Sequence, residues 1–299
     1  MGGSYAVGVD VGGTKIEAAL VDRSGDELAR KRVDSPRERQ ALLQVCAALV
    51  RELAGDSALA GVGFSIPGSL DPRTGILRNA PNMPHLAGTP FGADLAARLP
   101  WPVVLENDAN CLALSERAFG AARGRDHVCG IILGTGVGSG VIIGGRLLTG
   151  AHGLASEIGH VPLFDHAVRC ACGRTGCVEA FLSGPAHVRR YRAAGGDPGD
   201  GGAEVVFARA ETEAIARRVV MESMQLFVRL VVALVDLYDP EIVVLGGGLS
   251  RQPGFYAQTS AIEPMLPATA RAPAIVPAER GDASGKLGAA ALAFERALA

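Results

Sequence analysis

The apolar positions along the chain follow two periods, and each period predicts a different kind of element. Alternating or short apolar runs indicate strands, which are predicted at residues 6–10, 16–21, 31–33, 61–66 and 103–105. The first three should form an antiparallel meander. Apolar residues at helical spacing predict an amphipathic helix over about residues 38–54, whose apolar stripe should cover the sheet. A second helix, over about residues 109–119, directly follows the last of these strands.

The same arrangement begins again in the second half of the chain. Strands are predicted at residues 128–133 and 141–143, around a glycine loop, and later at 241–245 and 274–277. A long apolar helix is predicted over about residues 213–237, a closing helix from about residue 286, and a surface loop at 192–202. Two related α/β domains facing a cleft fit this order best. We expect them at residues 1–118 and 119–299.

The composition restricts the function classes. The 299 residues include 29 Lys and Arg against 31 Asp and Glu, so the net charge is −2 and no basic surface for nucleic acid is indicated. The first ten residues lack the basic region of a secretory signal. The uncharged stretch 128–145 contains seven glycines, which a membrane-spanning helix would tolerate badly. We therefore expect a cytoplasmic protein with no membrane or nucleic-acid partner.

A first candidate phosphate loop follows the first predicted strand, and its residues are Asp10, Gly12, Gly13, Thr14 and Lys15. The two glycines would let backbone N–H groups approach phosphate oxygens, and the hydroxyl and ammonium groups would add to that cradle. The carboxylate could hold a hydrated Mg²⁺ facing the same oxygens. An ordinary Gly-Gly hairpin turn is the alternative for this segment.

Two further glycine segments follow buried strands in the second half. Their candidate residues are Gly134, Thr135, Gly136 and Gly138 in one, and Gly246, Gly247 and Gly248 in the other. Neither the loop at 133–140 nor the loop at 10–15 has P-loop spacing, and neither opens a helix as the dinucleotide fingerprint requires. A nucleotide clamped between two β-hairpins from two domains is the remaining interpretation.

The most specific signal is a cluster of three cysteines and one histidine: His160, Cys170, Cys172 and Cys177. Zn²⁺ prefers four nitrogen and sulfur ligands at tetrahedral angles, and nearby glycines allow the sharp turns that this set needs. Four protein ligands would close the site, so the zinc would be structural. Unrelated free cysteines are the alternative, because a disulfide would leave one of the three thiols unpaired.

The segments DVGGTK at 10–15, LGTGVGSG at 133–140 and IVVLGGG at 242–248 resemble the phosphate and adenosine segments of the actin-like ATPase superfold, in its sugar-kinase branch, the ROK family. The resemblance extends over residues 5–293. It implies two actin-like ATPase (ribonuclease H-like) domains closing over ATP, Mg²⁺ and a sugar, with the final helix packing back on the N-terminal domain. The histidine and three cysteines match the family's zinc motif one by one. A homodimer is expected.

Two glutamates, Glu157 and Glu179, bracket the cysteine cluster. If zinc folds the loop, both carboxylates could reach one wall of the cleft and accept hydrogen bonds from sugar hydroxyls. His160 has two ring nitrogens, so one could bind zinc while the other donates toward the sugar. Solvated surface charges are the alternative for each glutamate.

The residues ENDANC at 106–111 lie between a predicted strand and a predicted helix, and they match the family's acceptor motif. Asp108 would be the general base that takes the proton from the attacking hydroxyl. An ordinary Asp suffices, because the loose transition state of phosphoryl transfer needs little basicity. Asn107 would offer a donor and an acceptor to one sugar hydroxyl. Helix capping by Asp108 is the alternative.

The loop at residues 81–86 is expected to cover the sugar site. Its polar candidate is Asn82, whereas His85 is expected at the surface. Ser65 and Gly68 could line the same pocket, with a plain strand end and turn as the alternative reading of that segment.

These residues and the resemblance together predict an ATP-dependent hexose kinase that phosphorylates the 6-hydroxyl of its sugar. The loop PNMPHLAG at 81–88 is similar to that of the family's N-acetylglucosamine kinases and lacks the Trp of several fructokinases and glucokinases. N-acetylglucosamine is therefore the expected sugar, with fructose and glucose as alternatives. A sugar-responsive ROK repressor would carry a helix-turn-helix region first, and the loop at Asp10 leaves no room for one.

Overall fold

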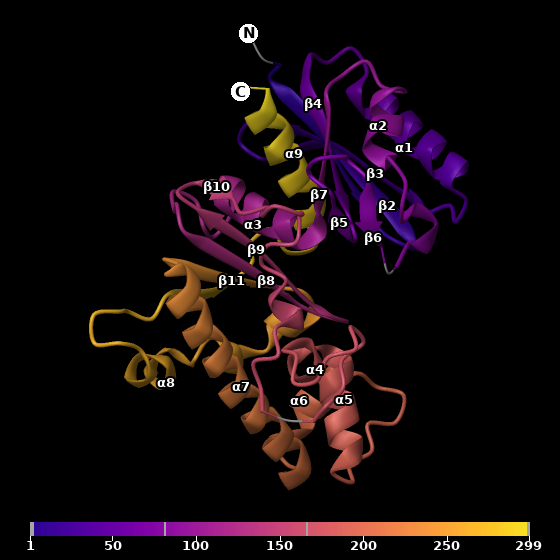
Figure 1. Cartoon of the computed structure of the whole chain (residues 1–299). Coiled ribbons are helices and arrows are strands. Elements are labelled where there is room, and N and C mark those ends of the chain that lie inside the picture. Colours follow the sequence, from indigo (N-terminus) through magenta and orange to yellow (C-terminus); the bar gives the residue numbers. More distant parts are fainter. Residues whose placement is uncertain (1–2, 81, 166, 298–299) are drawn as a thin grey trace. The chain divides into compact units, whose positions relative to one another are not determined.

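The computed structural model describes residues 3–80, 82–165 and 167–297 (Figure 1). The chain divides into two compact units. Unit 1 contains the described residues up to Gly124, then Leu147–Ser156 and the C-terminal segment from Glu279; unit 2 contains Arg125–Arg146 and Glu157–Ala278. The chain thus leaves unit 1 and returns to it twice, whereas a single boundary between residues 118 and 119 was expected. Each unit holds a five-stranded mixed sheet with helices, so the predicted α/β class is confirmed.

The sheet of unit 1 has the strand order β3-β2-β1-β4-β7. Its strands are β1 (Tyr5–Val11), β2 (Lys15–Asp22), β3 (Glu27–Asp34), β4 (Leu59–Ile66) and β7 (Val103–Asn107). The first three pair antiparallel, as the predicted meander requires, and β1, β4 and β7 pair in parallel. The register aligns Asp10 with Ser65 and Ser65 with Glu106. Polar residues from three strands therefore meet at one edge of this sheet.

Helices cover both faces of that sheet. The apolar stripe of α1 (Arg39–Ala54) packs on one face, as predicted, through residues such as Leu42, Cys46 and Val50. On the other face, α9 (Ser284–Arg296) packs against β1 and β4 and against α3 (Asp108–Phe119). Two glycines allow this close approach, because a Cβ at Gly8 would lie 1.9 Å from the Lys286 carbonyl oxygen and one at Gly63 1.9 Å from that of Ala289. Short elements complete the unit: α2 (Phe91–Ala96), β5 (Ser69–Leu70) and β6 (Leu77–Asn79).

A buried carboxylate fixes the chain where it returns to unit 1. The Glu116 side chain of α3 is fully buried and accepts hydrogen bonds from the backbone N–H groups of Ala121 at 2.9 Å, Glu279 at 3.0 Å and Arg280 at 2.8 Å. The Arg280 guanidinium in turn donates to the Phe119 carbonyl. The end of α3 and the segment leading into α9 are therefore held together at one point.

Unit 2 repeats the strand arrangement of unit 1, with the order β10-β9-β8-β11-β12. Its strands are β8 (Val128–Leu133), β9 (Val137–Ile143), β10 (Arg146–Leu147), β11 (Ile242–Gly246) and β12 (Ala274–Pro277). Its helices are α4 (Glu179–Leu182), α5 (Gly184–Ala193), α6 (Ala203–Arg209), α7 (Ala214–Tyr238) and α8 (Thr259–Ile262). One prediction was wrong in detail: β9 begins at Val137, so Gly138 lies within a strand. Its backbone pairs with Ile132 of β8, and this pairing extends the strand through the glycines.

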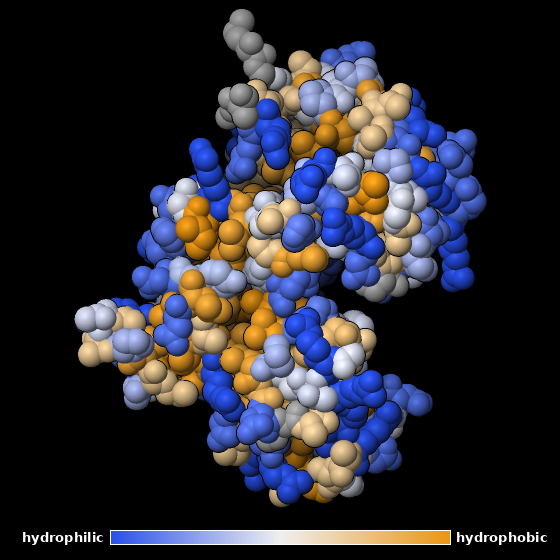
Figure 2. Space-filling view, viewed as in Figure 1, coloured by the Kyte–Doolittle hydropathy of each residue, from blue (hydrophilic) through white to orange (hydrophobic). Residues whose placement is uncertain are grey.

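Within the described part of the chain, no helix is long and apolar enough to cross a membrane. Hydrophilic side chains are spread over the face of the molecule seen in Figure 2. Even the long helix α7 has a polar side, where Arg217 and Arg218 are exposed.

Candidate active site

The first glycine loop lies in unit 1 as the turn of the β1–β2 hairpin. The Gly12 N–H donates to the Lys15 carbonyl at 2.9 Å, which closes the turn. A Cβ at Gly13 would lie 2.9 Å from the backbone oxygen of Asn82, so this loop and the segment at Asn82 are in close contact. The Lys15 ammonium donates to Glu17 at 2.8 Å. The predicted loop residues and Asn82 are therefore brought together; Pro81 lies outside the described residues.

Asp10 sits at the end of β1 in a confined position. Its Oδ1 accepts a hydrogen bond from the Ser65 hydroxyl at 2.8 Å. A Cβ at Gly285, at the start of α9, would lie 2.6 Å from this carboxylate. Burial raises the pKa of Asp10 above its usual range, the Ser65 hydrogen bond opposes that shift, and the charge of Glu17 adds to it. Ser65 was predicted as a pocket-lining residue; its side chain is fully buried and bonds to Asp10.

Asn107 and Asp108 occupy the junction of β7 and α3. Asn107 is the N-cap: its Oδ1 accepts from the Ala109 N–H at 2.9 Å, and its Nδ2 donates to the Gly68 carbonyl at 2.9 Å. Gly68 has φ of 123°, which favours glycine. The cap position thus belongs to Asn107, although Asp108 Oδ1 also accepts from the Ala109 N–H, at 2.9 Å. The Ala109 N–H is thus shared by Asn107 and Asp108, so the cap does not depend on Asp108 alone.

The Asp108 carboxylate has an unusual protonation equilibrium. Its side chain is exposed at the start of α3, although nearby protein atoms desolvate it. This desolvation raises its pKa to about 6, against the hydrogen bond from Ala109, and the negative charge of Asp10 contributes to the increase. A carboxylate with a pKa near 6 is poised to accept a proton at neutral pH.

The sequence placed Glu106 at this junction, but no role was predicted for its side chain. Its Oε1 accepts from the Asn107 N–H and from Asn110 Nδ2, each at 2.8 Å. Burial raises the pKa of Glu106. The available signal was the spacing of Glu106 and Asn110, four residues apart across a helix start, which lets the two side chains meet.

In unit 2, the second and third glycine segments line one pocket of about 670 Å³. Gly134, Thr135 and Gly248 lie in its wall, and Val188, Arg189 and Leu249 are lining residues that sequence reasoning missed. The Gly184 N–H donates to the Gly134 carbonyl at 2.8 Å, so α5 begins against the glycine loop. Gly247 has φ of 81° and approaches Leu133 closely, and Gly246 ends β11. A pocket of this size accommodates a nucleotide-sized ligand.

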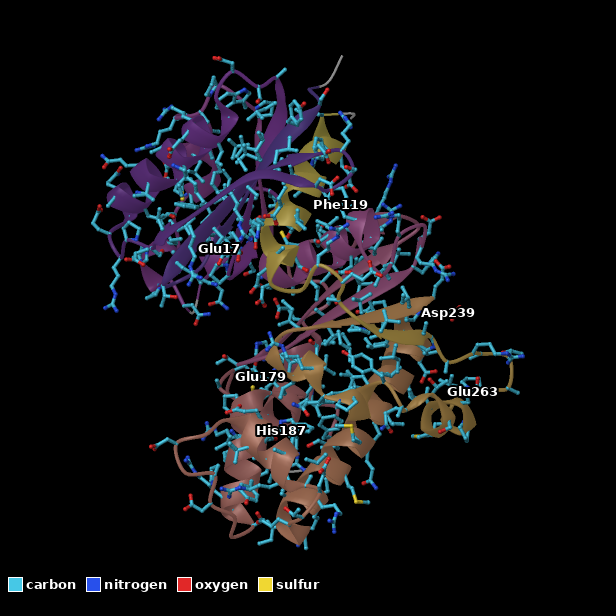
Figure 3. The ribbon with its side chains drawn as sticks, turned by 180° about the vertical axis from the view of Figure 1, so that it is seen from behind. Glu17, Phe119, Glu179, His187, Asp239 and Glu263 are labelled. Atoms are coloured by element: carbon cyan, nitrogen blue, oxygen red, sulfur yellow. The ribbon has the colours of Figure 1, made fainter. Side chains whose placement is uncertain are left out.

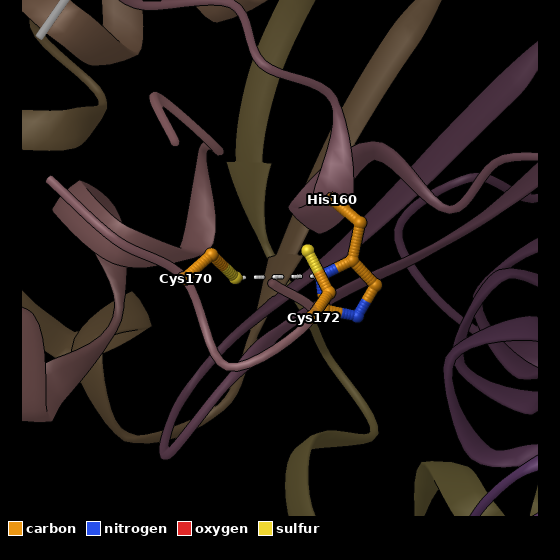
Figure 4. A group of neighbouring side chains, drawn as sticks. All are labelled: His160, Cys170 and Cys172. Carbon is orange, nitrogen blue, oxygen red and sulfur yellow. Dashed lines mark hydrogen bonds between the residues drawn. The ribbon is translucent and has the colours of Figure 1, made fainter. Parts of the chain in front are cut away.

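The cysteine and histidine cluster is also assembled within unit 2. The ligand atoms of His160, Cys170 and Cys172 all lie within 4.8 Å of one another (Figure 4). The Cys170 sulfur is 3.8 Å from His160 Nδ1, and the Cys177 sulfur is 3.6 Å from that of Cys172. Hydrogen bonds from Arg174 lower the pKa of the Cys172 thiol to about 6. The four residues singled out from their spacing are therefore neighbours in space.

Glu179 connects this cluster to the second glycine loop. One carboxylate oxygen accepts from the Val137 N–H at 3.1 Å, and the other lies 3.9 Å from the Cys170 sulfur. A Cβ at Gly136 would lie 2.7 Å from the same carboxylate, so a larger residue there would displace the Glu179 side chain. Figure 3 shows Glu179 in unit 2. Glu157, by contrast, is exposed where the short helix Ile158–His160 begins.

Comparison with known proteins identifies the family. The model of the ROK family matches residues 6–296, so this chain belongs to the ROK family, as its motifs predicted. Glucokinase from Thermotoga maritima is 33% identical, with 97% of each chain covered. N-acetyl-D-glucosamine kinase from Escherichia coli is 38% identical, with 95% of this chain and 98% of the relative covered.

Solved structures agree with this assignment. The ROK hexokinase from Thermus thermophilus has a TM-score of 0.89 at 32% identity, with 98% of each chain covered. The ROK glucokinase from Streptomyces griseus, solved with glucose and AMPPNP, has a TM-score of 0.78 at 31% identity, with 97% of this chain and 99% of that chain covered.

Proposed function

We propose that this chain is an ATP-dependent hexose kinase that transfers the γ-phosphoryl group of ATP to the 6-hydroxyl of N-acetylglucosamine. The observation that carries the proposal is the Asp108 carboxylate, accessible at a strand-to-helix junction, with a pKa of about 6 and Asp10 close enough to raise it. Relatives named glucokinase, hexokinase and N-acetyl-D-glucosamine kinase support it.

On this proposal, Asp108 accepts the proton of the attacking hydroxyl late in the transfer. Asp108 Oδ2 would take that proton, while Oδ1, which accepts from the Ala109 N–H, keeps the side chain oriented. Asn107 already uses its amide for the helix cap and for Gly68. The Oδ1 atom of Asn107 can accept one more hydrogen bond and its Nδ2 can donate one more. Asn107 could therefore also contact a sugar hydroxyl.

The donor side of the proposed reaction uses the three glycine segments. In unit 2, the pocket lined by Gly134, Thr135 and Gly248 would hold the nucleotide. In unit 1, the hairpin turn at Gly12 and Gly13 would present backbone N–H groups to the phosphates. When bound, Mg²⁺ would neutralise part of the phosphate charge, and Asp10 would hold the ion through water molecules.

The cysteine cluster fits a structural zinc. Tetrahedral bonds of about 2.3 Å to sulfur and 2.0 Å to nitrogen place two ligand sulfurs about 3.8 Å apart, and a sulfur and a nitrogen about 3.5 Å apart. The distances between Cys172 and Cys177, 3.6 Å, and between Cys170 and His160 Nδ1, 3.8 Å, lie within about 0.3 Å of that geometry. We propose that these four residues hold zinc and thereby fix Glu179 against the second glycine loop. His160 Nε2, Glu157 and Glu179 are then available as sugar contacts.

The choice of sugar within the family rests on the loop at Asn82 and on the relatives, which include both N-acetyl-D-glucosamine kinase and glucokinase. If Asn82 reads the acetamido group in a desolvated site, N-acetylglucosamine should exceed glucose in kcat/KM by about 100-fold or more. A coupled assay of ADP release with N-acetylglucosamine, glucose and fructose tests this. A kcat/KM for glucose or fructose equal to that for N-acetylglucosamine would contradict the choice of sugar but not the kinase assignment.

A further inference from the structure

A basic pocket of about 350 Å³ lies in unit 1, next to the β1–β2 hairpin. Its lining comes from β2, β3 and α9 and consists of Glu17, Ala18, Arg30, Lys31, Arg32 and Lys286. Lys31 is paired with Glu52 of α1. The proposed kinase chemistry uses none of the three remaining cations, Arg30, Arg32 and Lys286.

The sheet register explains how these cations come together. Arg30 pairs with Ala19 and Arg32 with Glu17 across β2 and β3, so both arginines project to the same face of the sheet as Ala19. Ala19 belongs to the apolar cluster that α9 covers. The arginines therefore stand beside the first turn of α9, which carries Lys286. Figure 3 shows Glu17 on the sheet next to this helix.

Lys286 is the least expected member of the pocket. It is only 5% exposed, and lysine is seldom buried without strong pairing. Its ammonium lies 3.2 Å from Glu27 and 3.7 Å from Glu17. An ammonium has three N–H donors, so these two contacts leave donor capacity for a further acceptor.

The local charge favours an anion. Apart from the paired Lys31, the three cations of the pocket, Arg30, Arg32 and Lys286, outnumber the carboxylates of Glu17 and Glu27 by one. Among the described residues, no carboxylate pairs with Arg30, and Arg32 reaches Glu17 only at 3.8 Å. Two guanidinium groups and an ammonium around a small pocket match a phosphate dianion, which arginine binds through two parallel hydrogen bonds.

We propose that this pocket is a second, regulatory binding site for a phosphate-bearing anion. The site is linked to the phosphate loop by Glu17, whose Oε1 holds Lys15 at 2.8 Å and whose Oε2 faces Lys286. An anion that engages Arg32 and Lys286 leaves Glu17 with Lys15 as its main partner and tightens that pair. If the proposed function holds, Lys15 is then less available to ATP, so the bound anion raises the KM for MgATP.

Inorganic phosphate is the probe for a direct binding test by titration calorimetry. The protein is first saturated with Mg²⁺ and the β,γ-imido analogue of ATP, so that the glycine loops are filled, and KCl holds the ionic strength constant. The test variant is Arg30→Glu/Arg32→Glu, with Arg30→Gln/Arg32→Gln as a milder version should the first fail to fold. The matched control is Arg218→Glu, a charge reversal on the exposed side of α7 in unit 2.

We expect one phosphate per chain to bind the wild type and Arg218→Glu with affinities within twofold of each other. The paired β3 variants should bind at least about tenfold more weakly, because two of the three cations are lost. No saturable binding to the wild type, unchanged affinity in the β3 variants, or equal weakening by Arg218→Glu would overturn the site. Binding is read without catalysis, so a failure of the proposed kinase function would leave this result standing.

The kinetic consequence is tested separately. In ADP-release assays at constant ionic strength, phosphate should raise the KM for MgATP more in the wild type than in Arg30→Glu/Arg32→Glu. Direct competition at the active site would act equally on both proteins. Equal responses would overturn the regulatory link.

Discussion

The raised pKa of Asp108 makes the proposed reaction dependent on pH in a defined direction. A general base must be deprotonated, so activity should rise as the pH rises through its pKa. With a pKa of about 6, about nine-tenths of the carboxylates are ionised at pH 7 and about one-tenth at pH 5. The kcat/KM for the sugar should therefore fall about tenfold from pH 7 to pH 5. An aspartate with the ordinary value of 3.8 would remain ionised over this range.

The assay is the initial rate of ADP release at saturating MgATP, with N-acetylglucosamine varied, between pH 5 and pH 8. Asp108→Asn should lower kcat by about two or more orders of magnitude, and its residual activity should lose the acidic limb of the profile. The loss of that limb distinguishes Asp108 from Asp10 and Glu106, whose pKa values are also raised. Asp56→Asn, an exposed matched change, should keep both the rate and the limb. A flat wild-type profile from pH 5 to pH 7, or near-wild-type kcat in a folded Asp108→Asn variant, would refute the role of this residue.

Four other outcomes are expected. Glu116→Ala should lower the free energy of unfolding by about 3–5 kcal/mol in urea titrations, because three backbone donors lose a buried acceptor; a loss below about 1 kcal/mol would contradict this. Gly63→Ala should lower the free energy of unfolding by about 2 kcal/mol or more, because the added Cβ would lie 1.9 Å from the Ala289 carbonyl oxygen. An unchanged melting temperature would contradict that packing. Burial lowers the pKa of His187 to about 4, so the unfolded state binds the proton first as the pH falls. The free energy of unfolding should therefore fall by up to about 3 kcal/mol from pH 6.5 to pH 4. His187→Gln should remove this pH dependence, and an unaltered dependence in that variant would contradict the role of His187. Elemental analysis should find one zinc per chain, lost in Cys172→Ser and kept in Cys46→Ala; active wild type without zinc would overturn the metal site.

Much of the architecture was predictable because it depends on local sequence patterns. The two strand–glycine loop–strand units follow from apolar runs broken by glycine, and α1 follows from helical spacing of apolar residues. The cysteine cluster was predictable because its three cysteines fall within eight residues. In each case, the residues that define the feature are close together in the sequence.

Features that depend on distant segments were not predictable in this way. The strand β3 is longer than the predicted 31–33, because pairing with β2 extends it from Glu27 to Asp34, and the exposed residues before Lys31 hide the strand pattern. Glu116 had no local signal, since its partners at residues 279 and 280 lie far along the chain. The helix cap was displaced by one residue, from Asp108 to Asn107, because Asn107 also binds Gly68.

The most direct test of the proposed function is identification of the product by ³¹P NMR. With MgATP and N-acetylglucosamine, the wild type should form the 6-phosphate and ADP in equal amounts. The 6-deoxy analogue should yield no sugar phosphate, because it lacks the accepting hydroxyl. Phosphate on any other hydroxyl, or no sugar phosphate with N-acetylglucosamine, glucose or fructose, would contradict assignment of this chain as a hexose 6-kinase.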